Sequence, residues 1–160
     1  MRVPPVFPLA VFYDASCPLC RAEMEAMKAR DTGNVLQLVD CSAPDFDAVA
    51  CTAEGVTPAM MMARIHARDA AGRWLRGVEV FAVVYRAAGL HRMARVYESA
   101  LLRPLLDRLY PWIADHRYWL SRFGLAPLFR MPAASTPAAC PVPGGGSTGV
   151  DSRQRPGGPN

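Results

Sequence analysis

The sequence of 160 residues predicts an α/β fold, in which a βαβ unit is followed by an antiparallel hairpin and a helical C-terminal extension. Two observations carry this prediction. Apolar runs at 6–13 and 35–39 flank a segment with apolar residues at helical spacing, which gives the order strand, helix, strand. From residue 78 onward the apolar residues keep helical spacing, so the chain changes there from mixed to helical structure.

The first strand, 6–13, is nearly all apolar, as is typical of a central strand buried on both faces. The helix after it should end near Arg30, because a turn follows at 31–34. The second strand, 35–39, should be parallel to the first, since a helix connects the two. A short helix over about 45–51, capped by Ser42 or Asp45, follows it.

Two cysteines with two residues between them, Cys17 and Cys20, stand where the first strand gives way to the helix. Cys17 should lie at the helix N-cap, where free N–H groups and the helix dipole lower a thiol pKa from about 8.5. Pro18 suits the first helical position. Cys20, one turn further, should share the face of Cys17 and be partly shielded. The placement predicts a thioredoxin-like redox pair, with Cys17 attacking and Cys20 resolving. Two ordinary buried cysteines are the alternative.

The chain also resembles the DCC family of thiol-disulfide oxidoreductases, named for its Asp-Cys-Cys signature. The motif that carries the resemblance is Tyr13-Asp14-x-x-Cys17-Pro18-Leu19-Cys20. The similarity continues through 39–40, 45–47, 62–66 and 77–81, and it covers about residues 6–125. One departure is Ala15, where the family usually has glycine. The resemblance implies a thioredoxin-like fold and thiol-disulfide exchange with a protein or small-molecule substrate. No cofactor and no metal are expected.

Three further positions are candidates for the site. Asp14 could accept the proton of Cys20 or bind backbone N–H groups of the turn before Cys17, and the turn role is favoured. Thr57-Pro58 could provide the cis-proline that thioredoxin-like enzymes place opposite the cysteines for substrate binding. Only about 5–6% of X–Pro bonds are cis, which favours Thr57 as a helix N-cap instead. Pro18, Thr57 and Pro58 are the candidate substrate-binding residues.

The rest of the chain divides into a hairpin, a helical block and a tail. Segments 64–68 and 72–77 should pair as antiparallel strands, with His66 more often structural than a proton acceptor. A helix over 78–88 should end at Gly89. The next helix should break or kink at Arg103-Pro104, and a last helix should begin at Pro111 and end near Gly124. The predicted units are a thioredoxin-like domain (1–89), a helical extension (90–130) and a disordered tail (131–160).

Positive charge concentrates in the helical block. Residues 1–85 carry eight basic and ten acidic side chains, whereas 86–130 carry eight arginines and three acidic residues. Such an excess is most often a solvated face, and no nucleic-acid partner is expected. Peripheral contact of these Arg-rich and aromatic helices with an anionic membrane is the alternative.

The five cysteines bear on compartment and on rival functions. An odd number of cysteines argues against a secreted disulfide scaffold. No run approaches the ~20 apolar residues of a membrane span, and the N-terminus is a poor signal peptide. These features predict a cytoplasmic protein. Two alternatives to an oxidoreductase stay open: a zinc site built from Cys17, Cys20, Cys41 and Cys51, and a non-catalytic adaptor domain.

Overall fold

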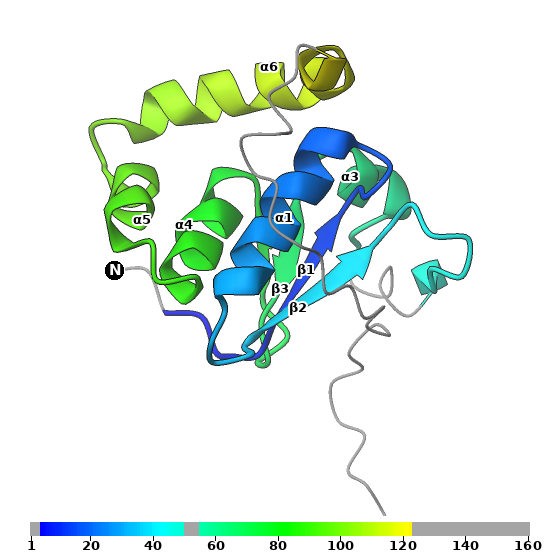
Figure 1. Cartoon of the computed structure of the whole chain (residues 1–160), viewed down its shortest axis with the longest axis horizontal. Coiled ribbons are helices and arrows are strands. Elements are labelled where there is room, and N and C mark those ends of the chain that lie inside the picture. Colours follow the sequence, from blue (N-terminus) through cyan, green and yellow to red (C-terminus); the bar gives the residue numbers. More distant parts are fainter. Residues whose placement is uncertain (1–3, 50–54, 123–160) are drawn as a thin grey trace, which may run out of the picture.

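The computed structural model describes residues 4–49 and 55–122, which form a mixed four-stranded sheet with helices on both faces (Figure 1). The strand order is β2-β1-β3-β4, with β1 parallel to β2 and both other pairs antiparallel. The strands are β1 (Leu9–Tyr13), β2 (Leu36–Asp40), β3 (His66–Arg68) and β4 (Trp74–Arg76). This arrangement confirms the predicted βαβ unit and hairpin, and it is consistent with a thioredoxin-like α/β fold.

The helices are α1 (Pro18–Arg30), α3 (Pro58–Ala63), α4 (Val78–Ala87), α5 (His91–Glu98) and α6 (Arg103–Arg122). The predicted limits of α1 and α4 are confirmed. Cys17 is the N-cap of α1, with Pro18 at the first helical position, and Gly89 follows α4 with φ +74°. Glycine adopts this positive φ at low cost, which is why it ends the helix.

Strand β1 is the centre of the core, because all five of its side chains are buried. Leu9, Val11 and Tyr13 pack in a cluster with residues of α1 and α4. Ala10 and Phe12 face the other side of the sheet, where Met61 of α3 contributes to a second cluster. The alternation follows from the two-residue repeat of a strand, and two apolar faces explain why the run contains no polar residue.

The helical extension packs onto the α1 and α4 face of the sheet. Ala94 of α5 is fully buried in the core cluster that contains Val11, and Tyr110 of α6 lies against the same cluster. The backbone N–H of Ile65 donates to the Tyr110 hydroxyl at 2.9 Å, and Arg64 forms an ion pair with Asp115 at 2.8 Å. These contacts join α6 to the segment that leads into β3.

The helix break predicted at Arg103-Pro104 is found just before Arg103, since α5 ends at Glu98, but the helix start predicted at Pro111 is wrong. α6 begins at Arg103, so Pro104 lies in its first turn, where a missing N–H costs no helical hydrogen bond. Pro111 lies inside α6 instead of starting a new helix. A proline there removes one hydrogen bond and bends the axis, and Figure 1 shows α6 changing direction along its length. Contacts of Tyr110 and Asp115 with the domain hold the helix on both sides of Pro111.

Two other predictions differ in detail. β1 starts at Leu9 rather than at residue 6, and Val6 and Phe7 are exposed. The short helix predicted over 45–51 with Ser42 or Asp45 as its cap begins only at Ala48, because residues 45–47 are not helical and the Asp47 carboxylate accepts from the Val49 N–H; residues 50–54 lie outside the described part. Cys51 and the predicted tail 131–160 also lie outside it.

Candidate functional site

The cysteine pair follows a loop at the carboxyl ends of the two parallel strands. Tyr13 ends β1 and pairs with Asp40, which ends β2. The Asp40 carboxylate accepts hydrogen bonds from the backbone N–H of Ala15 at 3.1 Å and of Ser42 at 2.8 Å. Asp40 therefore holds the loop that delivers Cys17 to the start of α1, a role that the sequence analysis missed.

Cys17 and Cys20 are free thiols at the start of α1. Cys20 is half-buried, which agrees with its expected partial shielding, whereas Cys17 has 0% exposed surface, a burial that the sequence did not predict. α6 packs against α1, and its Arg117 and Tyr118 bind Asp14, which precedes Cys17 by three residues.

The environment of Cys17 favours its thiolate and lowers its pKa to about 6. The hydrogen bond from the Cys20 thiol contributes most, and burial opposes it. Backbone N–H groups of Cys20 and Leu19 and the positive charge of Arg117 lower the pKa further. The same hydrogen bond to Cys17, together with burial, raises the pKa of Cys20. At neutral pH the pair therefore consists of a Cys17 thiolate and a Cys20 thiol, which is the state that thiol-disulfide exchange needs.

This asymmetry predicts the pH dependence of Cys17 alkylation. Only the thiolate reacts, so the iodoacetamide rate at Cys17 should rise with pH, reach half its maximum near pH 6 and stay constant above about pH 8. Peptide mass spectrometry measures this rate separately from the other cysteines. An Arg117→Gln variant should show a higher midpoint, because the charge that favours the thiolate is gone. A wild-type midpoint near 8.5 would mean that Cys17 is an ordinary thiol.

Asp14 joins the loop to α6. Its Oδ1 accepts hydrogen bonds from the backbone N–H of Ser16 at 3.0 Å and from the Ser16 hydroxyl. Its Oδ2 accepts from the Arg117 guanidinium at 2.7 Å and from the Tyr118 hydroxyl. Burial alone raises the pKa of Asp14, but the hydrogen bonds from Ser16 and Tyr118 and the Arg117 charge bring it below the ordinary value. The favoured turn role of Asp14 agrees with the Ser16 contacts, and its contacts with α6 were not foreseen.

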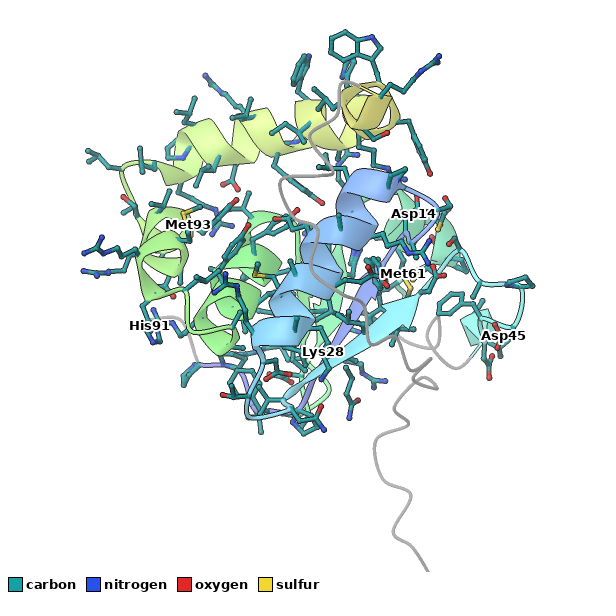
Figure 2. The ribbon with its side chains drawn as sticks, viewed as in Figure 1. Asp14, Lys28, Asp45, Met61, His91 and Met93 are labelled. Atoms are coloured by element: carbon teal, nitrogen blue, oxygen red, sulfur yellow. The ribbon has the colours of Figure 1, made fainter. Side chains whose placement is uncertain are left out.

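Arg117 and Tyr118 are thus site residues that the sequence analysis missed. They lie more than 100 positions after Asp14, and the only signal for them was the Arg-rich, aromatic composition of the helical block. In Figure 2, Asp14 and Lys28 mark the two ends of α1, and the last part of α6 lies above the Asp14 end.

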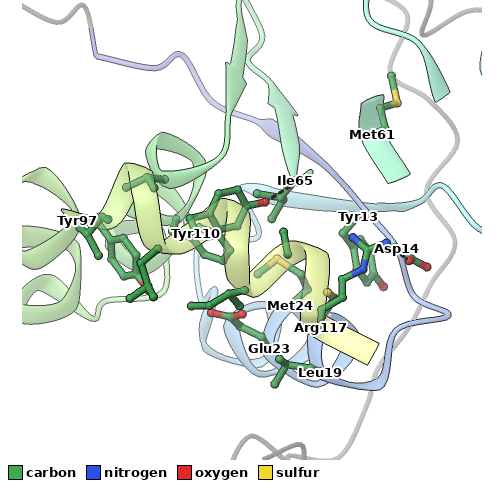
Figure 3. Close-up of a pocket in the computed structure, with 17 residues that line it drawn as sticks. Tyr13, Asp14, Leu19, Glu23, Met24, Met61, Ile65, Tyr97, Tyr110 and Arg117 are labelled. Atoms are coloured by element: carbon green, nitrogen blue, oxygen red, sulfur yellow. Dashed lines mark hydrogen bonds and ion pairs between the residues drawn. The ribbon is translucent and has the colours of Figure 1, made fainter. Parts of the chain in front are cut away.

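A cavity of about 230 Å³ lies beside Cys20, between α1, α4 and α6. Its walls are mainly apolar, and Cys20 and Glu23 are the polar groups that α1 contributes. Figure 3 shows Arg117 and Asp14 at one end of the cavity and Tyr97 at the other. The Tyr85 hydroxyl donates to Glu23 at 2.7 Å, and burial raises the pKa of the Glu23 carboxyl despite this bond. The cavity therefore places the Cys20 thiol in a mainly apolar surrounding.

The other candidate residues, Thr57, Pro58 and His66, belong to α3 and β3 and not to α1. Thr57 caps α3, with its hydroxyl accepting from the Met60 N–H at 3.3 Å, and its bond to Pro58 is not cis. Met61 of the same helix reaches the wall of the cavity. His66 is buried, its Nδ1 lies 2.8 Å from the Arg64 carbonyl oxygen, and its ring meets Trp74 edge-on. These contacts fit the structural role predicted for His66.

The residues proposed as zinc ligands are only partly described. Cys41 is buried, its sulfur lies 3.9 Å from the sulfur of Met61, and burial raises its pKa to about 12. Within residues 4–49 and 55–122, no group of three or more His, Cys, Asp or Glu side chains could hold a metal ion. Cys51, the fourth proposed ligand, lies outside these residues.

The outer surface of α6 bears on the predicted membrane contact. Leu105, Leu109 and Trp112 are exposed there, and the exposed Arg108 lies on the same helix. Within the part of the chain that the structure describes, no helix has the length and apolar character to cross a membrane. Peripheral contact with a membrane stays a prediction.

Comparison with known proteins relates this chain to one family and one curated relative. The model of the DCC1-like thiol-disulfide oxidoreductase family matches residues 11–123. An uncharacterized chloroplastic protein of Arabidopsis thaliana is 27% identical over 110 residues, which are 68% of this chain and 50% of the relative. The chain thus spans half the length of that relative. No solved structure matches.

Proposed function

Because the chain belongs to the DCC1-like thiol-disulfide oxidoreductase family, we propose that it exchanges disulfides through Cys17 and Cys20. The observation that carries this proposal is the pairing of a Cys17 thiol of low pKa with a neighbouring Cys20 thiol of raised pKa at the start of α1. The Cys17 sulfur is ionised and can attack a disulfide, whereas the Cys20 sulfur keeps its proton until it attacks the mixed disulfide.

In the proposed reaction the Cys17 thiolate attacks one sulfur of a substrate disulfide. A mixed disulfide with Cys17 forms, and the other half of the substrate leaves as a thiolate. Cys20 then loses its proton, attacks the Cys17 sulfur and releases the second half of the substrate. Two electrons pass to the substrate, and the protein is left with a Cys17–Cys20 disulfide.

Asp14 has a positioning role in this proposal. Its carboxylate holds the turn through Ser16 and holds Arg117 close enough to lower the pKa of Cys17. Pro18, Thr57 and Pro58 stay candidates for contact with substrate, although Thr57 is already engaged as a helix cap. The cytoplasmic location stays a prediction.

A redox titration tests the proposal. Purified protein is equilibrated in dithiothreitol buffers of graded potential, and its free thiols are trapped and counted by mass. A reversible two-electron transition should appear, and it should vanish in Cys17→Ser. A Cys140→Ser variant serves as the matched control and should keep the transition. If Cys17 and Cys20 stay reduced at every potential, the protein is no oxidoreductase. Stoichiometric zinc released on denaturation would favour the metal site instead.

A further inference from the structure

The cavity beside Cys20 is not required by thiol-disulfide exchange as such. We propose that it binds the uncharged, apolar substituent of a low-molecular-weight disulfide, which makes such a disulfide the substrate. The inference rests on the proposed function and adds the substrate class.

Access to the cysteine pair favours a small substrate over a folded protein. Cys17 has no exposed surface, and Arg117 and Tyr118 of α6 bind Asp14 next to it. A protein disulfide would need α6 to be displaced from the start of α1. A small molecule can instead occupy the cavity under α6, whose wall includes Cys20 but not Cys17, so that only a local movement at the Asp14 end of α6 is needed to bring Cys17 into contact with it.

The size and lining of the cavity define the substituent. Side chains such as Leu19, Met24, Phe81 and Ile113 form its walls. An engineered apolar cavity of about 150 Å³ binds benzene, so a cavity of 230 Å³ accepts an aromatic ring with a short chain. Burial of such a group is favourable by about 25 cal/mol for each Å² of apolar surface removed from water.

The polar groups around the cavity select against charge on the substituent. Asp14 and Arg117 neutralise one another at 2.7 Å, and burial raises the pKa of Glu23 towards its neutral form. A charged substituent would lose its hydration without gaining an opposite charge. An apolar substituent meets no such cost.

The same arrangement brings the substrate sulfurs to the cysteines. Cys20 lines the cavity and lies in the first turn of α1, directly after the N-cap Cys17, so a group that touches Cys20 lies close to the nucleophile. The Cys17 thiolate attacks R–S–S–R, forms Cys17–S–S–R and releases RS⁻, which takes a proton from solvent. Cys20 then gives up its proton and displaces the second RS⁻, which becomes RSH.

Arg117 lines the cavity, and its Nε is buried without a hydrogen-bond partner among the described residues. This N–H is available to the departing thiolate.

The test compares dibenzyl disulfide with glutathione disulfide, whose substituents are charged, in single-turnover oxidation of the reduced protein. The Ala114→Leu variant fills the cavity, because Ala114 is part of its wall. We expect its rate with dibenzyl disulfide to fall at least tenfold and its rate with glutathione disulfide to stay within twofold. Ala100→Leu, at an exposed position between α5 and α6, is the matched control and should leave both rates unchanged. Equal losses with both disulfides, or none, would overturn the inference.

A second measurement is independent of catalysis and of that variant. The unreactive probe benzyl methyl sulfide should bind a Cys17→Ser, Cys20→Ser protein in calorimetry, and it should inhibit the wild-type reaction with dibenzyl disulfide only. Binding without any exchange in the wild type would refute the proposed function but keep the cavity as an apolar site. Exchange without binding or inhibition would refute the inference about the substrate and keep the proposed function.

Discussion

A Cys20→Ser variant will accumulate a stable mixed disulfide at Cys17, whereas a Cys17→Ser variant will form none. The two cysteines differ in this way because only Cys17 has a lowered pKa and attacks at neutral pH. Serine at position 20 keeps a hydrogen-bond donor next to Cys17 but cannot release the bound half of the substrate. Exchange in both variants should therefore fall to the rate of the buffer thiols alone.

Mass spectrometry after mixing with dibenzyl disulfide measures this result. The Cys20→Ser protein should gain the mass of one benzyl thiolate group on the peptide that contains Cys17, and dithiothreitol should remove it. Cys41→Ser is the control, since Cys41 is buried with a raised pKa and should take no part. A mixed disulfide on Cys20 in the Cys17→Ser protein would reverse the assigned roles.

Loosening α6 from Asp14 will raise the maximal alkylation rate of Cys17 by about 10- to 100-fold. Hydrogen bonds to charged groups contribute about 1.5–3 kcal/mol each, and a change of about 1.4 kcal/mol shifts an equilibrium tenfold. Tyr118→Phe removes the hydroxyl that donates to Asp14 and leaves the charge of the site unchanged. The population in which α6 is displaced and Cys17 is exposed should increase accordingly.

The measurement is the plateau rate of iodoacetamide reaction above pH 8, where Cys17 is fully ionised in both proteins. Comparing plateaus separates access to the sulfur from any change in its pKa. Arg108→Gln is the matched control, because Arg108 is exposed on α6 and forms no ion pair with the described residues. An unchanged plateau in Tyr118→Phe would show that the hydroxyl does not hold α6 closed.

The sequence was sufficient for the elements whose signals are local. The all-apolar first strand, Pro18 after Cys17 and Gly89 after α4 each mark a boundary through their own backbone preferences. The pairing of β1 with β2 followed from the connection through a helix. The same reasoning failed at Pro111, because contacts distant in sequence hold α6 on both sides of the proline and outweigh its local preference.

The cysteine pair could be predicted from the sequence, but the packing of α6 next to it could not. Arg117 is one of eight arginines between residues 86 and 130, and nothing in their spacing distinguishes the one that binds Asp14. The sequence predicted the partial shielding of Cys20 but not the complete burial of Cys17. Local patterns identify the reactive groups, whereas their accessibility depends on the packing of distant segments.

The contact between Asp14 and Arg117 joins residues that are 103 positions apart, and this separation matters while the chain is being made. Ribosomes add about 5–20 residues per second, so roughly 5–20 seconds pass between the synthesis of Cys17 and that of Tyr118. Throughout that interval α6 does not yet pack against α1, and Cys17 lacks the Arg117 guanidinium that favours its thiolate. Protection of this sulfur is therefore acquired late in translation, when α6 docks onto a sheet that is already complete.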